Sequence, residues 1–176
     1  ITGIKRNRLK ALLENDISLL AYHLPLDVHS VVGNNVQLAK KLNLTITGPL
    51  EPAASKSIGL VGELAESMRA EDFKLEVSKV LNRECQHVGD EKEFIQRVAW
   101  CTGAAQSMID KAVDLGVDAF LSGEISEPTV HTARETGVHY FSAGHHATER
   151  YGVQALGAKL EAEFDIQFQF IDIDNP

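Results

Sequence analysis

Short apolar runs separated by amphipathic stretches set the pattern of this chain. In its C-terminal half, three such runs are each followed by a turn that contains glycine and then by a stretch with helical spacing; they are 98–101, 118–122 and 138–143. Continuous apolar runs are typical of strands buried on both faces, and strands that alternate with helices are typical of parallel sheets. The pattern therefore predicts an α/β protein, a layered α/β/α domain with a mostly parallel sheet.

The helices of this half are predicted from the spacing of apolar residues. One helix covers 105–112 and ends at Gly116, a second covers 126–136 with Pro128 in its first turn, and a third starts after Gly144. Proline is favoured in the first turn of a helix and glycine just after its last turn, which supports these boundaries.

The rest of the chain follows the pattern less regularly. Further strands are predicted from apolar or alternating residues at 17–22, 44–47, 58–61 and 166–170. Further helices are predicted around Leu9 to Leu13, from the cap residues Asn34 and Asn35 through Leu42, and from Phe73 to Leu81. The polar stretch 82–92 is predicted to be a loop.

Length and composition fit one domain. The chain has 176 residues, 44% of them hydrophobic, and an ordinary domain has about 100 to 200 residues. We expect a single α/β domain over 1–176, or the C-terminal majority of one. The stretch 49–57, rich in proline, alanine and serine, is the best candidate for an internal boundary.

Charge and cysteine content narrow the class of protein. With 17 basic and 25 acidic residues the net charge is −8, so we expect no nonspecific binding of DNA or RNA, which normally needs a basic face. Cys85 and Cys101 form no CxxC pair, which favours a reducing compartment and hence the cytoplasm. Cys101 is predicted to be buried and inert.

No targeting or membrane segment is expected. No apolar run approaches the roughly 20 residues that cross a bilayer, and the start of the chain has no signal-peptide layout. The first residue is Ile1 rather than methionine. We therefore expect the chain to begin partway into a longer protein or to be a processed form.

The segment 143–150 carries the most informative chemistry. It follows a predicted strand and opens a helix, on which His145 and Glu149 are four residues apart and share one face. An imidazole and a carboxylate placed in this way can bind one metal ion. The alternative is ordinary helix chemistry, because the helix dipole favours a carboxylate near an N-terminus. His146 points elsewhere by about a hundred degrees and is predicted to face solvent or to support the site.

Asp27 is a second candidate for the site. It lies between His23 and His29 just after a predicted strand, and Pro25 forces an extended chain before it. Asp27 is therefore a candidate metal ligand or general base. The alternative is that Asp27 is a turn or cap residue and that both histidines are partly exposed.

Glu124 follows another strand end in the sequence Ser122-Gly123-Glu124. It is a candidate base or hydrogen-bond partner for a ligand histidine, or alternatively a carboxylate at a helix N-terminus. Ligands of open α/β sheets bind outside the carboxyl ends of the strands, where Asp27, Glu124 and His145 are all predicted to lie. The P-loop, dinucleotide-binding and GxSxG motifs are absent from the sequence.

Four motifs, taken in order, resemble one known family. They are His-Leu-Pro-Leu-Asp at 23–27, Gly-Asn-Asn at 33–35, Ser-Gly-Glu at 122–124 and Gly-His-His-Ala-Thr-Glu-Arg at 144–150. Together they resemble the Ngg-one-interacting-factor-three-like family, also called GTP cyclohydrolase I type 2 homologues, and more closely its short bacterial YbgI-type branch. The resemblance covers essentially the whole chain.

The resemblance implies a dinuclear metal centre, a ring-shaped hexamer and a hydrolase-like activity. In the family pattern Asp27, His145 and Glu149 match metal ligands, and Gly123 and Glu124 match a motif beside the site. Family members also have an N-terminal portion whose adjacent His-His pair supplies further ligands, and we expect this portion to precede Ile1 in the intact protein. Three protein ligands are too few for two ions, because each ion usually takes about four donors or more.

These residues lead to one main functional expectation and one alternative. The first is a metal-dependent hydrolase of a nucleotide-like or phosphoester small molecule, with two divalent ions per subunit in the intact protein. The donors fit zinc, manganese, iron, nickel or magnesium, and Glu124 or His23 would move the proton. The alternative is a non-enzymatic metal-binding interaction protein, or a scaffold whose site has decayed.

Overall fold

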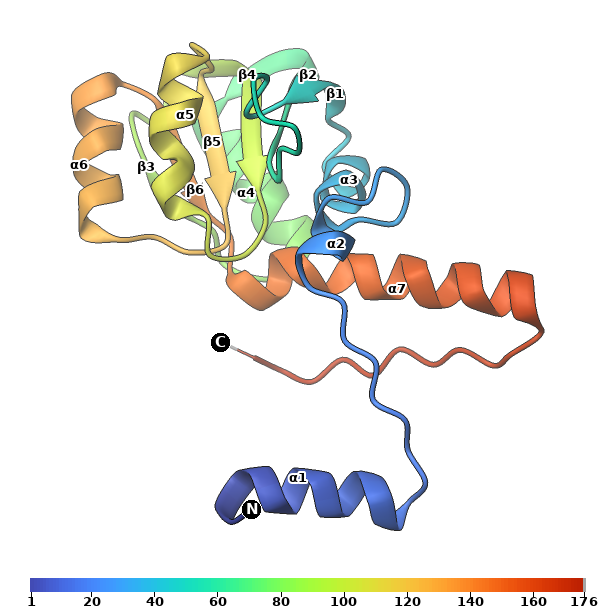
Figure 1. The fold of residues 1–176 in the computed structure, drawn as a ribbon. Helices are drawn as coiled ribbons and strands as arrows, with labels where there is room; N and C mark the ends of the chain where they lie inside the picture. Colours follow the sequence, from blue (N-terminus) through green and yellow to red (C-terminus); the bar gives the residue numbers. More distant parts are fainter. Residues whose placement is uncertain (176) are drawn as a thin grey trace.

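One six-stranded sheet with helices on both faces forms the body of the protein (Figure 1). The computed structural model describes residues 1–175. The elements, in chain order, are α1 (Gly3–Glu14), α2 (Leu24–Asp27), α3 (Asn34–Lys41), β1 (Thr45–Pro49), β2 (Leu60–Arg69), α4 (Ala70–Leu81), β3 (Gln86–Val88), β4 (Phe94–Cys101), the short 3-10 helix η1 (Gln106–Met108), α5 (Ile109–Asp114), β5 (Ala119–Ser122), α6 (Glu127–Thr136), β6 (His139–Ser142) and α7 (His145–Phe164).

The predicted layered α/β fold is confirmed, and its parallel strands lie in the centre of the sheet. The strand order is β1-β2-β4-β5-β6-β3. β4 pairs with β5 and β5 with β6 in parallel, whereas β1–β2, β2–β4 and β3–β6 pair antiparallel. The stretch 49–57 lies in the connection between β1 and β2, which are paired with each other.

The sheet separates two apolar layers. Along β4, Val98 and Trp100 belong to one layer and Ala99 and Cys101 to the other, because successive side chains of a strand point to opposite faces. Residues of α3, α4 and α7 pack in the first layer, and residues of α5 and α6 pack in the second. Cys101 is buried as predicted, and burial raises the pKa of its thiol to about 12.

Two predicted strands are wrong. Residues 17–22 and 166–170 form neither strand nor helix, and Leu20 is 76% exposed. A strand needs a hydrogen-bonded neighbour to be stable, and within residues 1–175 every paired strand belongs to the one sheet that leaves both segments out.

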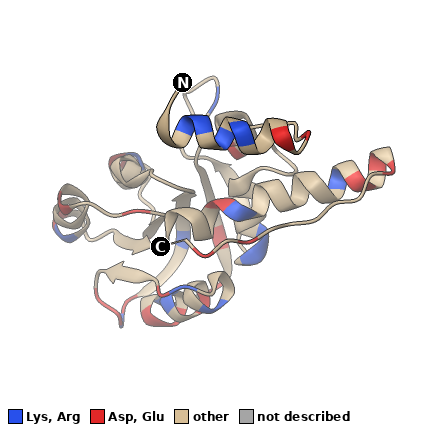
Figure 2. Cartoon of the chain, turned by 90° about the horizontal axis from the view of Figure 1, so that it is seen from below, with Lys and Arg blue, Asp and Glu red and all other residues tan. Residues whose placement is uncertain are grey.

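α1 also stands apart from the sheet. None of its residues is buried, and an extended segment joins it to α2 (Figure 1). Several lysine and arginine residues lie along this helix, coloured blue in Figure 2. None of the helices described in residues 1–175 is long and apolar enough to cross a membrane.

Two local predictions need correction. The predicted loop 82–92 contains β3, which pairs with β6 through residues such as Gln86, opposite Ser142. β3 has only three residues, too few to show an alternating pattern in the sequence. Asn34 and Asn35 do not cap α3, because the N-cap position is occupied by Gly33, which has no side chain that could accept a capping hydrogen bond. Both asparagine side chains are instead buried and bonded to other elements.

Candidate metal and substrate site

The carboxyl ends of the three parallel strands form a platform for the site. Beyond the strands, the N–H of Gly123 donates to the carbonyl oxygen of Gly103 at 2.9 Å, and the N–H of Gly144 donates to that of Gly123 at 2.8 Å. The Ser122 hydroxyl also donates to the carbonyl oxygen of Gly103. These bonds link the turns that follow β4, β5 and β6 and fix the spacing between them.

Two of these glycines lie against residues of the first turns of α7. A Cβ on Gly103 would lie 2.0 Å from Glu149 Oε1 and 3.1 Å from His145 Nε2, and Gly103 also has a φ of +69°. A Cβ on Gly123 would lie 2.8 Å from the Cα of His145. The first turn of α7 therefore sits directly on the backbone of two neighbouring turns, which places His145 and Glu149 at the strand ends.

His145 lies between two carboxylates. Its Nδ1 is 2.7 Å from Glu124 Oε1 and its Nε2 is 3.0 Å from Glu149 Oε2. The hydrogen bond to Glu124 is the main cause of a raised pKa at His145. Burial is the main cause of a raised pKa at Glu149, and the charge of nearby Asp27 raises that pKa further. The structure thus brings together three of the residues predicted from the sequence.

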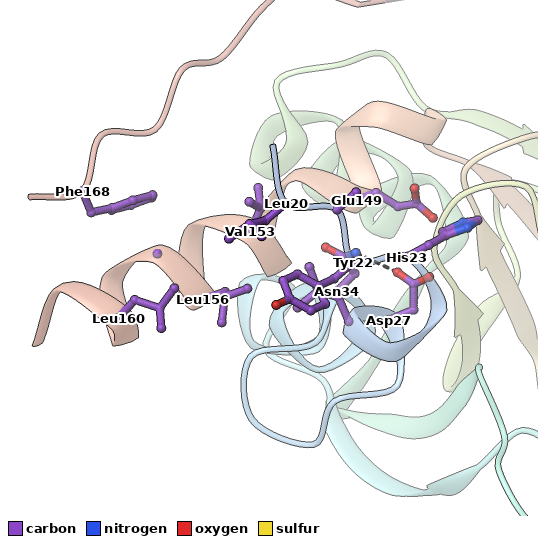
Figure 3. Close-up of a pocket in the computed structure, with 13 residues that line it drawn as sticks. Leu20, Tyr22, His23, Asp27, Asn34, Glu149, Val153, Leu156, Leu160 and Phe168 are labelled. Atoms are coloured by element: carbon purple, nitrogen blue, oxygen red, sulfur yellow. Dashed lines mark hydrogen bonds between the residues drawn. The ribbon is translucent and has the colours of Figure 1, made fainter. Parts of the chain in front are cut away.

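Asp27 is held in place by a neighbouring amide. It ends α2, is only 5% exposed, and its Oδ1 accepts a hydrogen bond of 2.7 Å from Asn34 Nδ2 (Figure 3). The other end of the same amide, Asn34 Oδ1, accepts a bond of 2.7 Å from the N–H of Gly152 in α7. Asn34 therefore fixes Asp27 relative to the helix that carries His145 and Glu149.

Asn35 joins the same region to the sheet. Its Nδ2 donates to the carbonyl oxygen of Ile58, and its Oδ1 accepts from the N–H of Thr102. Its own carbonyl oxygen accepts from Trp100 Nε1 at 3.0 Å. Sequence reasoning missed the roles of Asn34 and Asn35, although two adjacent asparagines after a glycine were the available signal.

A cavity of about 410 Å³ extends from these acidic residues along α7. His23, Asp27 and Glu149 line one part of it, and apolar side chains of α7 such as Val153 and Leu156 line its wall (Figure 3).

The two remaining histidines near the site have other contacts. His29 Nδ1 accepts hydrogen bonds from the N–H groups of Val31 and Val32, so His29 holds its own turn. His146 Nε2 lies 3.1 Å from Asp172 Oδ1. Neither contact involves His145 or Glu149.

The donors fit a divalent ion by their chemistry but are few. Two donors that share one ion at the usual bond lengths of about 2.0–2.2 Å are roughly 3 Å apart, and His145 Nε2 and Glu149 Oε2 have this separation. Within residues 1–175, however, no group of three His, Cys, Asp or Glu side chains is arranged to hold a metal ion. Asp27 lines the same cavity as Glu149 but is bonded to Asn34.

Comparison with known proteins places this chain in a family. A model of the family described as Duf34/NIF3 (NGG1p interacting factor 3) matches residues 1–176. A Pseudomonas aeruginosa protein named GTP cyclohydrolase 1 type 2 homolog is 58% identical over 176 residues, which are 100% of this chain and 69% of that protein. A Haemophilus influenzae protein of the same name is 52% identical over 179 residues, which cover 100% of this chain and 70% of that protein.

A solved structure agrees with these matches. The structure described as protein ybgI, of unknown function, superposes with a TM-score of 0.93 at 49% identity and covers 100% of this chain and 70% of that one. The resemblance seen in the four motifs is thereby confirmed, and the chain belongs to the Duf34/NIF3 (NGG1p interacting factor 3) family.

Proposed function

We propose that this protein binds a divalent metal ion and acts as a metal-dependent hydrolase of a nucleotide-like or phosphoester small molecule. One observation carries the proposal. An imidazole nitrogen of His145 and a carboxylate oxygen of Glu149 lie 3.0 Å apart, above a glycine that leaves room for both, beside a cavity that Asp27 also lines.

His145 and Glu149 would hold the ion, with Asp27 as a further donor. Imidazole and carboxylate donors suit zinc, manganese, iron, nickel or magnesium. When bound, such an ion supplies Lewis acidity and lowers the pKa of a coordinated water. The two ions per subunit implied by the family resemblance need more donors than these three residues provide.

The negative charge of the cavity favours the binding of a cation before any substrate enters. Asp27 and Glu149 by themselves repel a phosphate group, so an anionic substrate is admitted only when their charge is offset. The apolar wall formed by residues such as Leu156 and Leu160 offers a surface for an uncharged part of the substrate. His23 lines the same cavity, where it could receive or deliver a proton.

A homo-oligomer, as in the ring-shaped hexamer implied by the resemblance, is part of the proposal. Its support is the apolar surface of the terminal segments, where Leu13 is 80% exposed and Ile173 is 72% exposed. Large exposed apolar surface commonly marks an interaction site. Light scattering on the purified chain tests this part, since a monomer at working concentration would contradict it.

A second candidate function is metal binding without turnover, for interaction or as a scaffold. The observation that favours it is the small number of donors, because residues 1–175 do not bring three of them together. An ion held mainly by His145 and Glu149 would then serve recognition or local order rather than hydrolysis.

Hydrolysis assays separate the two candidates. Nucleotides and a chromogenic phosphodiester are incubated with the protein and each divalent ion in turn. We expect ion-dependent turnover that falls about 100-fold or more in Glu149→Gln. Glu163→Gln, an exposed change on the same helix, is the matched control and should keep full activity. Ion binding without turnover in the unmodified protein would favour the non-enzymatic function. Turnover that does not change when divalent ions or chelators are added would contradict metal-dependent hydrolysis.

A further inference from the structure

We propose that a cationic cavity beside the candidate metal site binds a phosphate group, and that the tail of the chain, residues 165–175, occupies this cavity in the present structure. The cavity has a volume of about 320 Å³, and Arg83, His146 and Arg150 line it together with Asp172 of the tail. Use of the cavity by a substrate rests on the proposed function. Anion binding itself is a property of this chain and can be measured without a metal.

All the acidic residues that line this cavity belong to the tail. The two arginines and His146 belong to the body of the protein, whereas the two carboxylates come from Asp172 and Asp174. Removal of the tail would leave two permanent positive charges and no carboxylate in the lining, although the whole chain has a net charge of −8. A cavity of this kind attracts an anion.

Arg150 is held in a fixed position at the cavity. Its Nη2 donates to the carbonyl oxygen of Leu81, the last residue of α4, at 2.7 Å. Its guanidinium also lies 5.5 Å from the centre of the Tyr151 ring. Its Nη1 donates to Asp172 Oδ2 at 2.9 Å. Because two contacts with the body of the protein fix the guanidinium, Nη1 keeps its direction when another anion replaces the tail carboxylate.

The Asp172 carboxylate shows how this cavity binds an anion. One of its oxygens, Oδ2, accepts from Arg150, and the other, Oδ1, lies 3.1 Å from His146 Nε2. A carboxylate only accepts hydrogen bonds, so Nε2 donates to it. Each oxygen therefore has its own donor, and two oxygens of a phosphate group can replace them.

Arg83 favours a phosphate over a carboxylate. Its guanidinium lies over Gly144, where an added Cβ would be 3.0 Å from Arg83 Cζ. Among residues 1–175, Asp172 forms its ion pairs with His146 and Arg150, which leaves Arg83 as a further cation at the cavity. A phosphate carries more charge and more acceptor oxygens than a carboxylate, so it can use this additional donor.

The tail is held weakly enough to be displaced. It runs back beside α7, with the Phe168 ring over Gly157 and Asp172 near the start of the helix (Figure 1). On either side of Asp172, Ile171 is 70% exposed and Ile173 is 72% exposed, so little apolar surface holds this part of the tail. A partly exposed ion pair contributes little to stability. A more strongly bound anion can therefore take the place of Asp172.

The cationic cavity adjoins the candidate metal ligands. A neighbouring cavity of about 500 Å³ is lined by His145, His146, Glu149 and Asn175. His146 and Asn175 also line the cationic cavity. A phosphate held by Arg150 and His146 would therefore lie on the side that faces an ion held by His145 and Glu149.

Phosphate titration of the metal-free chain tests this inference. Binding of inorganic phosphate is followed through the amide NMR signals of residues 146–150 at low, constant ionic strength. Arg150→Gln removes the fixed donor and should lower phosphate affinity by about 10- to 100-fold. Arg83→Gln changes a more exposed cation and should lower it by about 2- to 5-fold. Asp172→Asn removes the competing carboxylate and should raise it by about 2- to 5-fold.

The amide signals of the tail give an independent readout. At saturating phosphate the signals of residues 171–175 should move to the positions that they already have in Asp172→Asn without phosphate. Arg134→Gln on α6 and Asp110→Asn on α5 remove the same charges at exposed positions and should change neither measurement. Acetate should bind more weakly than phosphate. If Arg150→Gln fails to fold by circular dichroism, Arg83→Gln and Asp172→Asn decide the point.

The outcomes separate this inference from the proposed function. Phosphate affinity that stays the same in both arginine variants overturns the inference, as do tail signals that stay fixed at saturating phosphate. Acetate binding as tight as phosphate binding overturns the choice of phosphate. The expected phosphate results in a chain that binds no zinc would leave the anion subsite intact and reject the metal. Zinc bound through His145 and Glu149, with a phosphate affinity that no variant changes, would do the reverse.

Discussion

Replacing Gly103 with alanine perturbs the site at its closest contact. The φ of +69° lies in the left-handed region, where alanine costs about 1–2 kcal/mol. The new Cβ would lie 2.0 Å from Glu149 Oε1, so the carboxylate must move and its 3.0 Å contact with His145 is lost. A hydrogen bond to a charged group contributes about 1.5–3 kcal/mol, and partial exposure of Glu149 places this contact near the lower end. We expect the free energy of unfolding to fall by about 2–4 kcal/mol.

Gly116→Ala is the matched control for this change. Gly116 has a φ of +62° and nothing within 4 Å of its added Cβ, so only the backbone cost applies. Urea denaturation should therefore show Gly103→Ala to be less stable than Gly116→Ala by about 1–2 kcal/mol. Zinc titration should show an affinity lowered about 100-fold in Gly103→Ala alone. Equal stability and equal zinc affinity in the two variants would mean that the close contact between residue 103 and Glu149 affects neither property.

Three other predictions concern protonation, buried amides and thiols. Burial is the main cause that lowers the pKa of His87 to about 4. Between pH 6.5 and 4 the unfolded chain binds a proton at His87 that the native state does not bind. The contribution of neutral His87 to the free energy of unfolding is therefore complete above pH 6.5 and is lost as the pH falls toward 4. His87→Gln should flatten this dependence by about 1–2 kcal/mol, with solvent screening taken into account, and an unchanged slope would contradict the assignment. Asn34→Ala leaves Asp27 without its amide donor and should lower the free energy of unfolding by about 2–3 kcal/mol in urea titrations. A loss below about 0.5 kcal/mol would contradict a stabilising role for the hydrogen bonds that Asn34 makes to Asp27 and Gly152. Cys85 and Cys101 are buried with thiol pKa values raised by burial to about 12, so a thiol reagent should label them only after unfolding.

The central βα units could be predicted from the sequence. Strands β4, β5 and β6 are largely buried, so they appear as apolar runs, and each ends at a turn that contains glycine. The helices that follow them show helical spacing and ordinary end signals. Pattern and structure agree here because burial is decided by nearby residues.

The terminal segments could not be predicted in the same way. Residues 17–22 and 166–170 have the composition of strands, but a strand also needs a hydrogen-bonded neighbour, which composition does not report. The sequence did not predict β3 for the opposite reason. Its three residues are enough to pair with β6 but too few to show an alternating pattern.

The site was predicted only where its residues follow a spacing or a motif. His145 and Glu149 are four residues apart on one helix, so their contact follows from helix geometry. Asn34 acts through a hydrogen bond to Gly152 of α7, at a sequence separation of 118 residues. No local pattern encodes such contacts.

Counting zinc ions bound per chain shows directly whether His145 and Glu149 hold a metal ion. After dialysis against zinc, elemental analysis should find at least one ion in the unmodified protein and in His146→Ala, whose imidazole lies against Asp172. His145→Ala and Glu149→Gln should each lose that ion. An unmodified chain without zinc, or an ion lost in His146→Ala and kept in His145→Ala, would contradict the account.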